Sequence, residues 1–558
     1  MINILFSTFI TNCFIFSYGA FLYIYIFKER ITKNNIYEIP IFGVIILSFI
    51  SLLINFLLPI SKSVGTIILS LGILYLIYYI KNNPSIFKKF IKIIIISTII
   101  TFLLLAYSNI YRPDGGLYHL PFISILNENK IIFGLSNIHF RFGTTSIIQY
   151  LSAIQNNYIY EVSSISIPIA SIFSFVIIFF IKNVFEKIKS KEFILSLFYF
   201  FISISCLLNY GSFGNYGNDA VSNLYFYVFI LIFLENFNHL RTKSIGFFKI
   251  FILSIFLFAT KAFMSLILMV PFIIFLFQKR KIELFKKIST YICLVIICSW
   301  FVRSIIISGC IIYPLKETCY SNLKYYDNAK TIQEASAGEA WAKDWVNQKE
   351  TKLDYNRYNK QFNWLKTWSG NHLIKIIEKM TPFTVFLLLF FIFNYFKSRN
   401  DYRMPKGFTL MLLFSLVMTL IWFLKFPLYR YGSSFLIVSI VSIIILLMKN
   451  LKIFPNPNYI KKNFRVLLII FTILFVSKNI LRIYENKVVL NNNIWPDIYS
   501  ENNSGKLNKF QLLKKSNKHL YYFSKGKLCM YSKSPCSNYN IDNLNKEYIG
   551  NYSIYFID

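Results

Sequence analysis

The sequence predicts an all-α integral membrane protein with about 14 transmembrane helices, and its composition gives the first indication. Of the 558 residues, 56% are hydrophobic and only 15% are charged, whereas soluble globular domains carry roughly 25% charged residues. The charges are unequal, with 59 Lys and Arg against 25 Asp and Glu. This composition excludes a disordered chain and disfavours a cytosolic enzyme. It leaves a membrane protein with basic loops or a nucleic-acid binder.

Apolar stretches long enough for membrane helices recur along the whole chain. About 20 largely apolar residues are needed to cross a bilayer core. We expect spans near residues 4–27, 39–59, 66–80, 91–107, 162–181, 193–208, 220–234, 245–260, 262–277, 288–307, 380–396, 407–424, 433–448 and 466–481.

The placement of the charges decides between the two remaining classes. If alternate connections face the cytoplasm, those connections hold 27 Lys or Arg and 7 Asp or Glu, and they are residues 28–38, 81–92, 182–192, 235–244, 278–287, 397–406 and 449–465. The short connections on the other side hold only 7 basic residues. Because basic residues collect in cytoplasmic loops, we expect both termini outside the cytoplasm and no nucleic-acid partner.

The spans and the polar segments between them predict three parts. Residues 1–80 form an N-terminal transmembrane unit of three helices, residues 81–481 a core transmembrane domain, and residues 482–558 a small extracytoplasmic domain. The core has two long outer loops, 108–161 and 303–379. The second contains the helix-prone stretch QEASAGEAWAKDW, and the tail contains the β-prone stretches HLYYFS and YSIYFID.

Four of the eight cysteines fall in the predicted outer segments, and they are Cys310, Cys319, Cys529 and Cys536. Disulfides persist on the oxidising side of a membrane. The pairs 310–319 and 529–536 would each close a short loop, with cross-pairing as an alternative. A zinc site is the rival interpretation, but no CxxC pattern supports it.

The first outer loop carries the most prominent carboxylate, Asp114, in the sequence RPDGGLYHLP. Proline and glycine predict a turn around it, and LYHLPFISIL could follow as a short helix along the membrane interface. The same loop contains further polar candidates, which are Arg112, His119, His139 and Arg141. The simpler interpretation is that Asp114 caps the helix after it; the functional one is a catalytic carboxylate.

A second outer carboxylate, Asp219, ends the glycine-rich stretch NYGSFGNYGND just before a span. It reads first as a helix cap. The alternative is a second acid in the same cavity, as a ligand of a divalent metal or as an acceptor for substrate hydroxyls.

Cations form the complementary set at the outer ends of the spans. Lys261, Arg303, Lys425 and Arg430 lie there without an acidic neighbour in sequence. Such residues often anchor helices at the interface by snorkelling. Together they would bind an anionic group such as a lipid phosphate, which arginine grips with two hydrogen bonds.

Several stretches resemble landmarks of a large bacterial family of multi-span membrane proteins that has no assigned activity. They are DGGLYHLP, GLSNIHFRFG, WFVRSIIISGCIIYPL, PLYRYG and CMYSKSPC, and the resemblance covers about residues 90–540. The carboxylate in the first sizeable outer loop, followed by many spans, also resembles the GT-C fold of membrane glycosyltransferases. In GT-C enzymes that loop usually follows the first span, whereas Asp114 follows the fourth. We therefore interpret 91–107 as the first core helix.

The GT-C resemblance implies a transferase of the bacterial inner membrane that moves a sugar from a polyprenyl-phosphate donor to a cell-envelope acceptor at the outer face. Asp114 would be the general base. The cations Arg112, Lys261, Arg303 and Arg430 would bind the phosphate, and His119, His139 and Arg141 would contact acceptor or sugar. A divalent metal is compatible but not required.

Two other classes fit the same residues. A surface-polysaccharide polymerase or ligase would use arginines and the loop 303–379, and a flippase or transporter of lipid-linked sugar would need a polar pathway through the spans. No P-loop or GxGxxG motif supports a nucleotide-driven pump.

Overall fold

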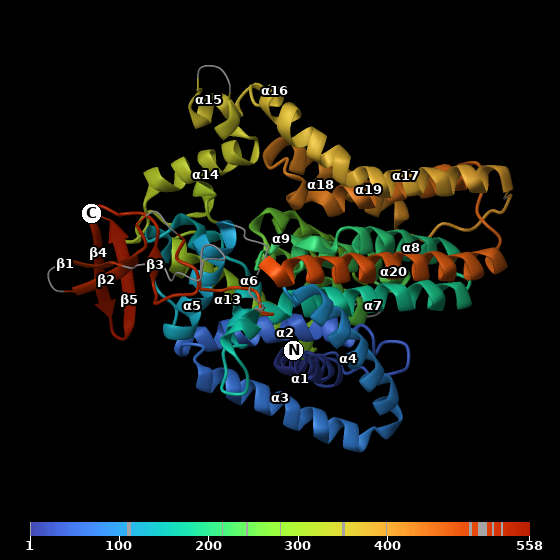
Figure 1. The fold of residues 1–558 in the computed structure, drawn as a ribbon, viewed down its shortest axis with the longest axis horizontal. Helices are drawn as coiled ribbons and strands as arrows, with labels where there is room; N and C mark the ends of the chain where they lie inside the picture. The colour runs from blue at the N-terminus through green and yellow to red at the C-terminus, as the bar shows by residue number, and fades with distance from the viewer. Residues whose placement is uncertain are drawn as a thin grey trace.

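The protein is described here from a computed structural model. The described residues are 2–108, 113–214, 216–240, 244–279, 281–348, 352–397, 399–489, 494–499, 511–515, 518–525 and 528–557. Long helices lie side by side over most of the molecule, while short helices, loops and strands gather at one end (Figure 1). We call this the loop-rich end and the opposite end the far end.

The N-terminal half supplies the centre of the bundle. Its long helices are α1 (Ile2–Phe21, continued by the π-helical turn η1, Leu22–Ile26), α2 (Ile39–Leu57), α3 (Lys62–Asn82), α4 (Pro84–Leu105), α7 (Ile167–Lys189), α8 (Phe193–Leu208), α9 (Asp219–Asn236), α10 (Ser244–Thr260) and α13 (Ile288–Ser308). Between α10 and α13 lie η8 (Ala262–Leu268), α11 (Met269–Leu276) and α12 (Lys281–Phe285).

The C-terminal half adds four long helices to this centre (Figure 1). They are α17 (Ile374–Lys397), α18 (Phe408–Lys425), α19 (Tyr429–Asn450) and α20 (Pro457–Val489).

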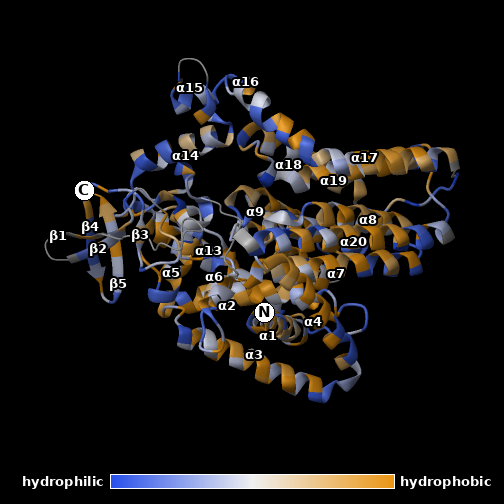
Figure 2. Ribbon diagram, viewed as in Figure 1, coloured by the Kyte–Doolittle hydropathy of each residue, from blue (hydrophilic) through white to orange (hydrophobic). Residues whose placement is uncertain are grey.

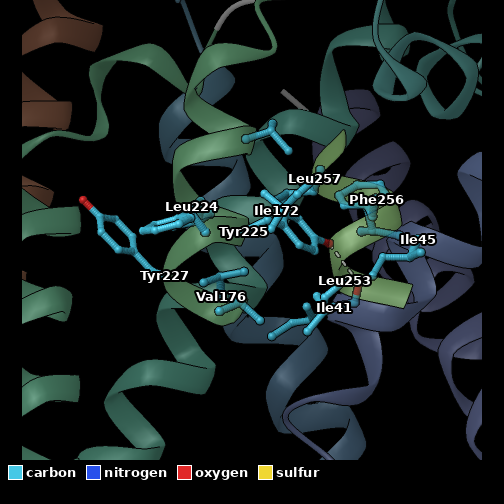
Figure 3. Packing of buried hydrophobic residues seen from close by; sticks show 14 of the residues in the cluster. Ile41, Ile45, Ile172, Val176, Leu224, Tyr225, Tyr227, Leu253, Phe256 and Leu257 are labelled. Carbon is cyan, nitrogen blue, oxygen red and sulfur yellow. Dashed lines mark hydrogen bonds between the residues drawn. The ribbon is translucent and has the colours of Figure 1, made fainter. Parts of the chain in front are cut away.

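The core forms where α2, α7, α9 and α10 meet. Side chains from all four helices interlock there, including Ile45, Val176, Leu224 and Phe256 (Figure 3). Tyr225 is buried among them, and its hydroxyl donates to the carbonyl of Ile41 at 2.8 Å. Because α2 belongs to the region expected as a separate N-terminal unit, that unit shares its core with the rest of the bundle.

Ten helices within the described residues are long and apolar enough to cross a membrane. They are Ile2–Ile26, Ile39–Leu57, Lys62–Asn82, Val162–Lys189, Asp219–His239, Ile288–Ser308, Leu365–Phe396, Phe408–Lys425, Tyr429–Asn450 and Tyr459–Lys487. Three further apolar helices are shorter, namely Phe193–Leu208, Ser244–Thr260 and Ala262–Leu276. Every stretch predicted as a span is largely helical, but α4 belongs to neither group and the predicted count of 14 is not confirmed.

The outer surface of the bundle is apolar, as a lipid-facing surface requires. Leu389 of α17, Leu410 of α18 and Ile473 of α20 each expose more than half of their surface, and hydropathy is high along these helices while the loop-rich end is polar (Figure 2). Soluble monomers rarely expose contiguous apolar patches of this kind. The protein is a predominantly helical membrane protein.

Short elements build the loop-rich end from two separate segments. The first contains η2 (Gly115–His119), α5 (Leu120–Glu128), η3 (Leu135–Asn137), η4 (Phe140–Thr144), α6 (Ile147–Ala153) and η5 (Val162–Ser166). The second contains η9 (Lys316–Thr318), α14 (Asn328–Ala342), η10 (Trp345–Asn347), α15 (Tyr355–Asn359), α16 (Leu365–Trp368) and η11 (Ser369–Leu373). Two single turns, η6 (Tyr210–Ser212) and η7 (Phe237–His239), lie elsewhere in the bundle.

The strands of the C-terminal region form two small sheets at this end. In one, β1 (Gln511–Lys515) pairs antiparallel with β2 (Lys518–Phe523), which pairs parallel with β3 (Cys536–Ser537). In the other, β4 (Leu544–Ile549) pairs antiparallel with β5 (Tyr552–Ile557), with Lys546 opposite Tyr555. β5 also forms a parallel bridge to the first loop segment at Phe133, so the tail is joined to the bundle.

Two disulfides brace the loop-rich end, Cys310–Cys319 and Cys529–Cys536, the pairs that the sequence favours. The second closes a loop over α5. Ser124 donates to the carbonyl of Ser532, and Ser534 donates to Glu128 at 2.8 Å. Residues 120–127 of α5 are all buried, so this helix is covered by protein and does not lie open along an interface.

Candidate functional site

Four charged side chains from four distant parts of the chain meet at the loop-rich end. Nη1 of Arg430 lies 2.9 Å from Oδ2 of Asp114, and Nε of Arg430 lies 3.4 Å from Oδ2 of Asp219. The other oxygen of Asp219 accepts from Nζ of Lys261 at 2.5 Å. We call Asp114, Asp219, Lys261 and Arg430 the loop-end cluster.

Local structure leaves both carboxylates available for these contacts. Asp114 occupies the cap position before η2 and its side chain makes no capping hydrogen bond, while Asp219 is the first residue of α9, one position after the cap residue Asn218. The capping role considered from the sequence is therefore not seen. η2 is a π-helical turn, a distortion that is frequent at functional sites.

An asparagine fixes α9 to α19 directly below the cluster. The side-chain amide of Asn223 donates to the backbone carbonyls of Asp219 at 2.9 Å and Arg430 at 2.8 Å. Its carbonyl oxygen accepts from the hydroxyl of Ser434 at 2.7 Å. These bonds hold the backbones of Asp219 and Arg430 together. The distance between the two residues is therefore not set by the flexible Arg430 side chain alone.

Aromatic rings form a wall beside the charges. Nζ of Lys261 lies 3.3 Å from the centre of the Tyr431 ring, and Cζ of Arg430 lies 5.1 Å from it. On the first loop, Cζ of Arg141 lies 6.0 Å from the ring centre of Tyr118. Cations over aromatic faces are attracted to them, and more strongly where water is excluded.

The cluster is half-open, and its environment alters its chemistry. Arg430 exposes 42% of its side chain and Asp114 exposes 35%. Burial lowers the pKa of Lys261 from its ordinary 10.5 to about 8, against the opposing charge of Asp219. Burial and the neighbouring Asp114 raise the pKa of Tyr118 well above its usual value, so its hydroxyl stays protonated.

A small pocket adjoins the cluster, and Lys261 lines it together with Arg303, Thr145, Trp300 and Tyr313. Arg303 is only 1% exposed. It donates to Thr145, its Nε lies 3.4 Å from the hydroxyl of Tyr150, and its Cζ lies 4.7 Å from the ring centre of Trp300.

Arg303 has no carboxylate partner among the described residues. A buried charge without a counter-charge is costly. The pocket is therefore suited to an anion, which would supply the missing negative charge.

The structure brings some predicted residues together and separates others. Asp114, Asp219, Lys261 and Arg430 form one cluster, and Arg303 lies across the pocket that Lys261 shares. Arg141 lies near the ring of Tyr118 on the first loop. Arg112 lies outside the described residues.

The two histidines predicted to contact substrate are both buried. Nδ1 of His119 hydrogen-bonds the side chain of Gln149 at 2.5 Å, and Nδ1 of His139 accepts from the backbone of Arg141 at 3.1 Å. Burial lowers the pKa of His119 to about 4 and that of His139 to about 3. Both rings are therefore neutral at pH 7 and do not add positive charge for a phosphate.

The arrangement does not favour a metal shared by the two acids. Arg430 bridges Asp114 and Asp219 in the position that such an ion would take. Within the described ranges, no three His, Cys, Asp or Glu side chains gather as metal ligands.

Sequence reasoning missed a histidine that contacts a buried carboxylate. His372 lies in η11, where its Nε2 is 3.4 Å from Oδ1 of Asp344. Both residues fall in the polar loop 303–379, which was expected only as a substrate platform. The signal in the sequence is weak: a lone histidine one turn before a long apolar helix.

A family sequence profile that matches most of the chain identifies its family. The sequence profile of a domain of unknown function, DUF8201, matches residues 1–437. The chain is a DUF8201 protein. That match includes the whole loop-end cluster and Arg303. No curated protein and no solved structure matches this DUF8201 member.

Proposed function

We propose that this protein is a membrane glycosyltransferase that moves a sugar from a polyprenyl-phosphate donor to a cell-envelope acceptor. The observation that carries the proposal is the loop-end cluster beside a pocket with a buried, unneutralised Arg303. Carboxylates and an anion site within one half-open region are what such a transfer needs.

In this proposal Asp114 takes the proton of the acceptor hydroxyl as its oxygen bonds to the anomeric carbon. The bond from that carbon to the phosphate oxygen breaks, and its electron pair leaves with the lipid phosphate. Arg303 and Lys261 meet the developing negative charge. Arg430, already neutralised by two acids, acts mainly to hold Asp114 and Asp219 in place.

The proposed location is the outer face of the bacterial inner membrane, with both termini outside the cytoplasm. The distribution of Lys and Arg supports this orientation. Glu29, Glu38 and the basic connections would then lie on the cytoplasmic side, and the loop-rich end would face the envelope. The exposed apolar surfaces of α17, α18 and α20 give a lipid-linked donor a route from the bilayer.

The test uses the full chain in liposomes with a panel of polyprenyl-phosphate-linked radiolabelled hexoses and an envelope fraction as acceptor. Asp114→Asn should lower transfer by at least about 10²-fold, the contribution typical of a general base, without changing the melting temperature in detergent. Glu547→Gln is the control, since that carboxylate is half-exposed on β4. Full transfer by Asp114→Asn would contradict the proposal.

A polymerase or ligase of surface polysaccharide is the second candidate, and Arg303 favours it specifically. Such an enzyme would rely on the guanidinium more than on a carboxylate base. Retained transfer in Asp114→Asn combined with loss in Arg303→Gln would select it. Arg303→Lys keeps the positive charge and is the control. Transfer that is retained in Arg303→Lys but lost in Arg303→Gln would indicate loss of the anion site and not of the fold.

A further inference from the structure

The turn between β4 and β5 exposes apolar side chains at the loop-rich end. Farther along the hairpin, Ile554 is buried in a small cluster with Tyr325. At the turn, Ile549 exposes 66% of its surface and Tyr548 exposes 59%, and the chain reverses at Gly550, whose φ is 56°. The hairpin is therefore packed on protein at one end and open at the other.

A hydrogen bond joins this turn to the end of a helix that is long and apolar enough to span the membrane. The hydroxyl of Tyr552 donates to the carbonyl of Phe56 at 3.0 Å, and Phe56 is the second-last residue of α2. Ile549 lies directly opposite Tyr552 in the hairpin. Because directly opposite residues of an antiparallel pair share one face, Ile549 lies on the face that is turned toward α2.

The length of α2 places this contact at the edge of the bilayer. α2 has 19 residues, which extend over about 28 Å at 1.5 Å per residue. A bilayer hydrocarbon core is about 30 Å thick, so the two ends of α2 lie at its two boundaries. Leu57 and Leu58, at the end that Tyr552 contacts, each expose more than half of their surface. The β4–β5 turn therefore lies where acyl chains meet headgroups.

Lysines flank these apolar side chains. Nζ of Lys130 lies 3.9 Å from the ring centre of Tyr552, and Lys62 is exposed at the start of α3, four residues after Leu58. Tyrosine is enriched at membrane interfaces, and lysine extends its ammonium group into the headgroup layer. Apolar side chains flanked by ammonium groups match the acyl chains and the phosphates of a phospholipid surface.

We propose that the β4–β5 turn contacts the membrane directly. Ile549 lies against acyl chains together with Leu57 and Leu58, and the ammonium groups of Lys62 and Lys130 bind phosphates of the headgroups. This contact holds the C-terminal tail on the bilayer beside α2. It forms whether or not the protein transfers a sugar, so it is independent of the proposed function.

Fluorescence quenching tests the contact in the full-length protein in liposomes of phosphatidylcholine and phosphatidylglycerol. Ile549→Cys carries an environment-sensitive fluorophore in a Cys298→Ser background, because Cys298 is an exposed free cysteine. Phosphatidylcholine brominated along its acyl chains should quench this label strongly, and iodide in the buffer should quench it weakly. Tyr548→Cys is the matched control: the side chain is similarly exposed but points to the opposite face of the hairpin, so iodide should quench its label.

The other outcomes overturn the proposal. Strong quenching of the Ile549 label by iodide would mean that the turn lies in water. Quenching by neither agent would mean that protein covers it. Equal responses of the Ile549 and Tyr548 labels to both quenchers would mean that neither face of the turn is directed to the bilayer.

A second pair of variants tests the contact without a label. Ile549→Asp places a charge against acyl chains, and amide hydrogen exchange in β4 and β5 should become roughly tenfold faster in liposomes, because the hairpin loses its contact with the bilayer. Tyr548→Asp, on the opposite face, should leave the exchange nearly unchanged. Equal exchange in the wild type and in Ile549→Asp would contradict the proposal.

Discussion

Two ionic clusters lie at opposite ends of the same helices, and they differ in how far their side chains are exposed to solvent. The loop-end cluster begins at Asp219, the first residue of α9. About 24 Å along that helix, at 1.5 Å per residue, Glu235 pairs with Lys187 at 2.9 Å. Beside it, Lys249 pairs with Glu29 at 3.3 Å and Glu38 at 3.2 Å. We call these five residues the far-end cluster.

The far-end cluster is the more buried of the two. Lys249 exposes only 9% of its side chain, and the hydroxyl of buried Tyr199 donates to Glu235 at 3.0 Å. At the loop-rich end, by contrast, Arg430 and Asp114 are partly open and a pocket adjoins them. Ion pairs alone therefore do not mark a functional site. The loop-end cluster is distinguished by its access to solvent and by the adjoining pocket that Arg303 lines.

The largest effect is expected from removing Lys249, the central cation of the far-end cluster. Lys249→Met should leave two acids without their counter-charge and reduce stability by about 3–5 kcal/mol, the usual cost of breaking a buried ion pair. Thermal unfolding in detergent measures this, with Lys182→Met, whose pair with Glu186 is more exposed, as the control. An unchanged melting temperature would refute a structural role for the cluster.

The close contact under Asp114 should be the next most sensitive position. A Cβ on Gly116 would lie 2.4 Å from Sδ of Met530 and 3.0 Å from Cβ of Leu528, so Gly116→Ala should cost about 1–3 kcal/mol and reduce transfer by displacing η2. In contrast, Gly338→Ala in α14 meets open space and should stabilise by about 0.5–1 kcal/mol. Unfolding and transfer assays compare the two variants. Equal effects on stability and on transfer would mean that Gly116 does not contact Met530 and Leu528.

The pH dependence of transfer sharpens the difference between the clusters further. Because Lys261 has a pKa of about 8, transfer should fall as the pH rises above about 8, by at most about tenfold per unit. The unfolded chain keeps this lysine protonated to higher pH, so between about 8 and 10.5 its titration adds stability, and unfolding does not explain the fall. In Lys261→Arg, whose side chain stays charged, the fall in transfer should begin at a higher pH. A fall that begins at the same pH as in the wild type would show that another group titrates.

The smallest effect is expected at an ion pair outside both clusters. Nζ of Lys324 lies 2.8 Å from both oxygens of Glu547, and both side chains are about half exposed. Exposed pairs contribute less than about 1 kcal/mol, so Lys324→Ala should barely change the melting temperature and should leave transfer intact. A loss of several degrees would show that the tail depends on this contact.

Much of the helical architecture could be predicted from the sequence, because hydropathy and length are local properties. The stretch QEASAGEAWAKDW falls largely in α14, and HLYYFS and YSIYFID became β2 and β5. The number of spans was not predictable to the same degree. α4 has three lysines in its first half, and α8, α10 and α11 are short, so whether each crosses the membrane depends on its neighbours.

The contacts of the site lay beyond the reach of sequence reasoning. Asp114 and Arg430 are separated by 316 residues, and with one sequence nothing local shows that they meet. Hydropathy also gave no reason to select Asp344, since its contact with His372 is formed only by the fold. The cations were expected to act alike, yet Arg430 is neutralised by two acids while Arg303 is not.

The loop closed by Cys529 and Cys536 has a consequence for how the protein matures. The backbone N–H of Met530 in this loop donates to the carbonyl of Gly116 at 2.8 Å, two residues after Asp114. Residues 528–537 are synthesised after every helix of the bundle. The turn that holds Asp114 therefore lacks this contact until residues 528–537 have been made and folded onto it.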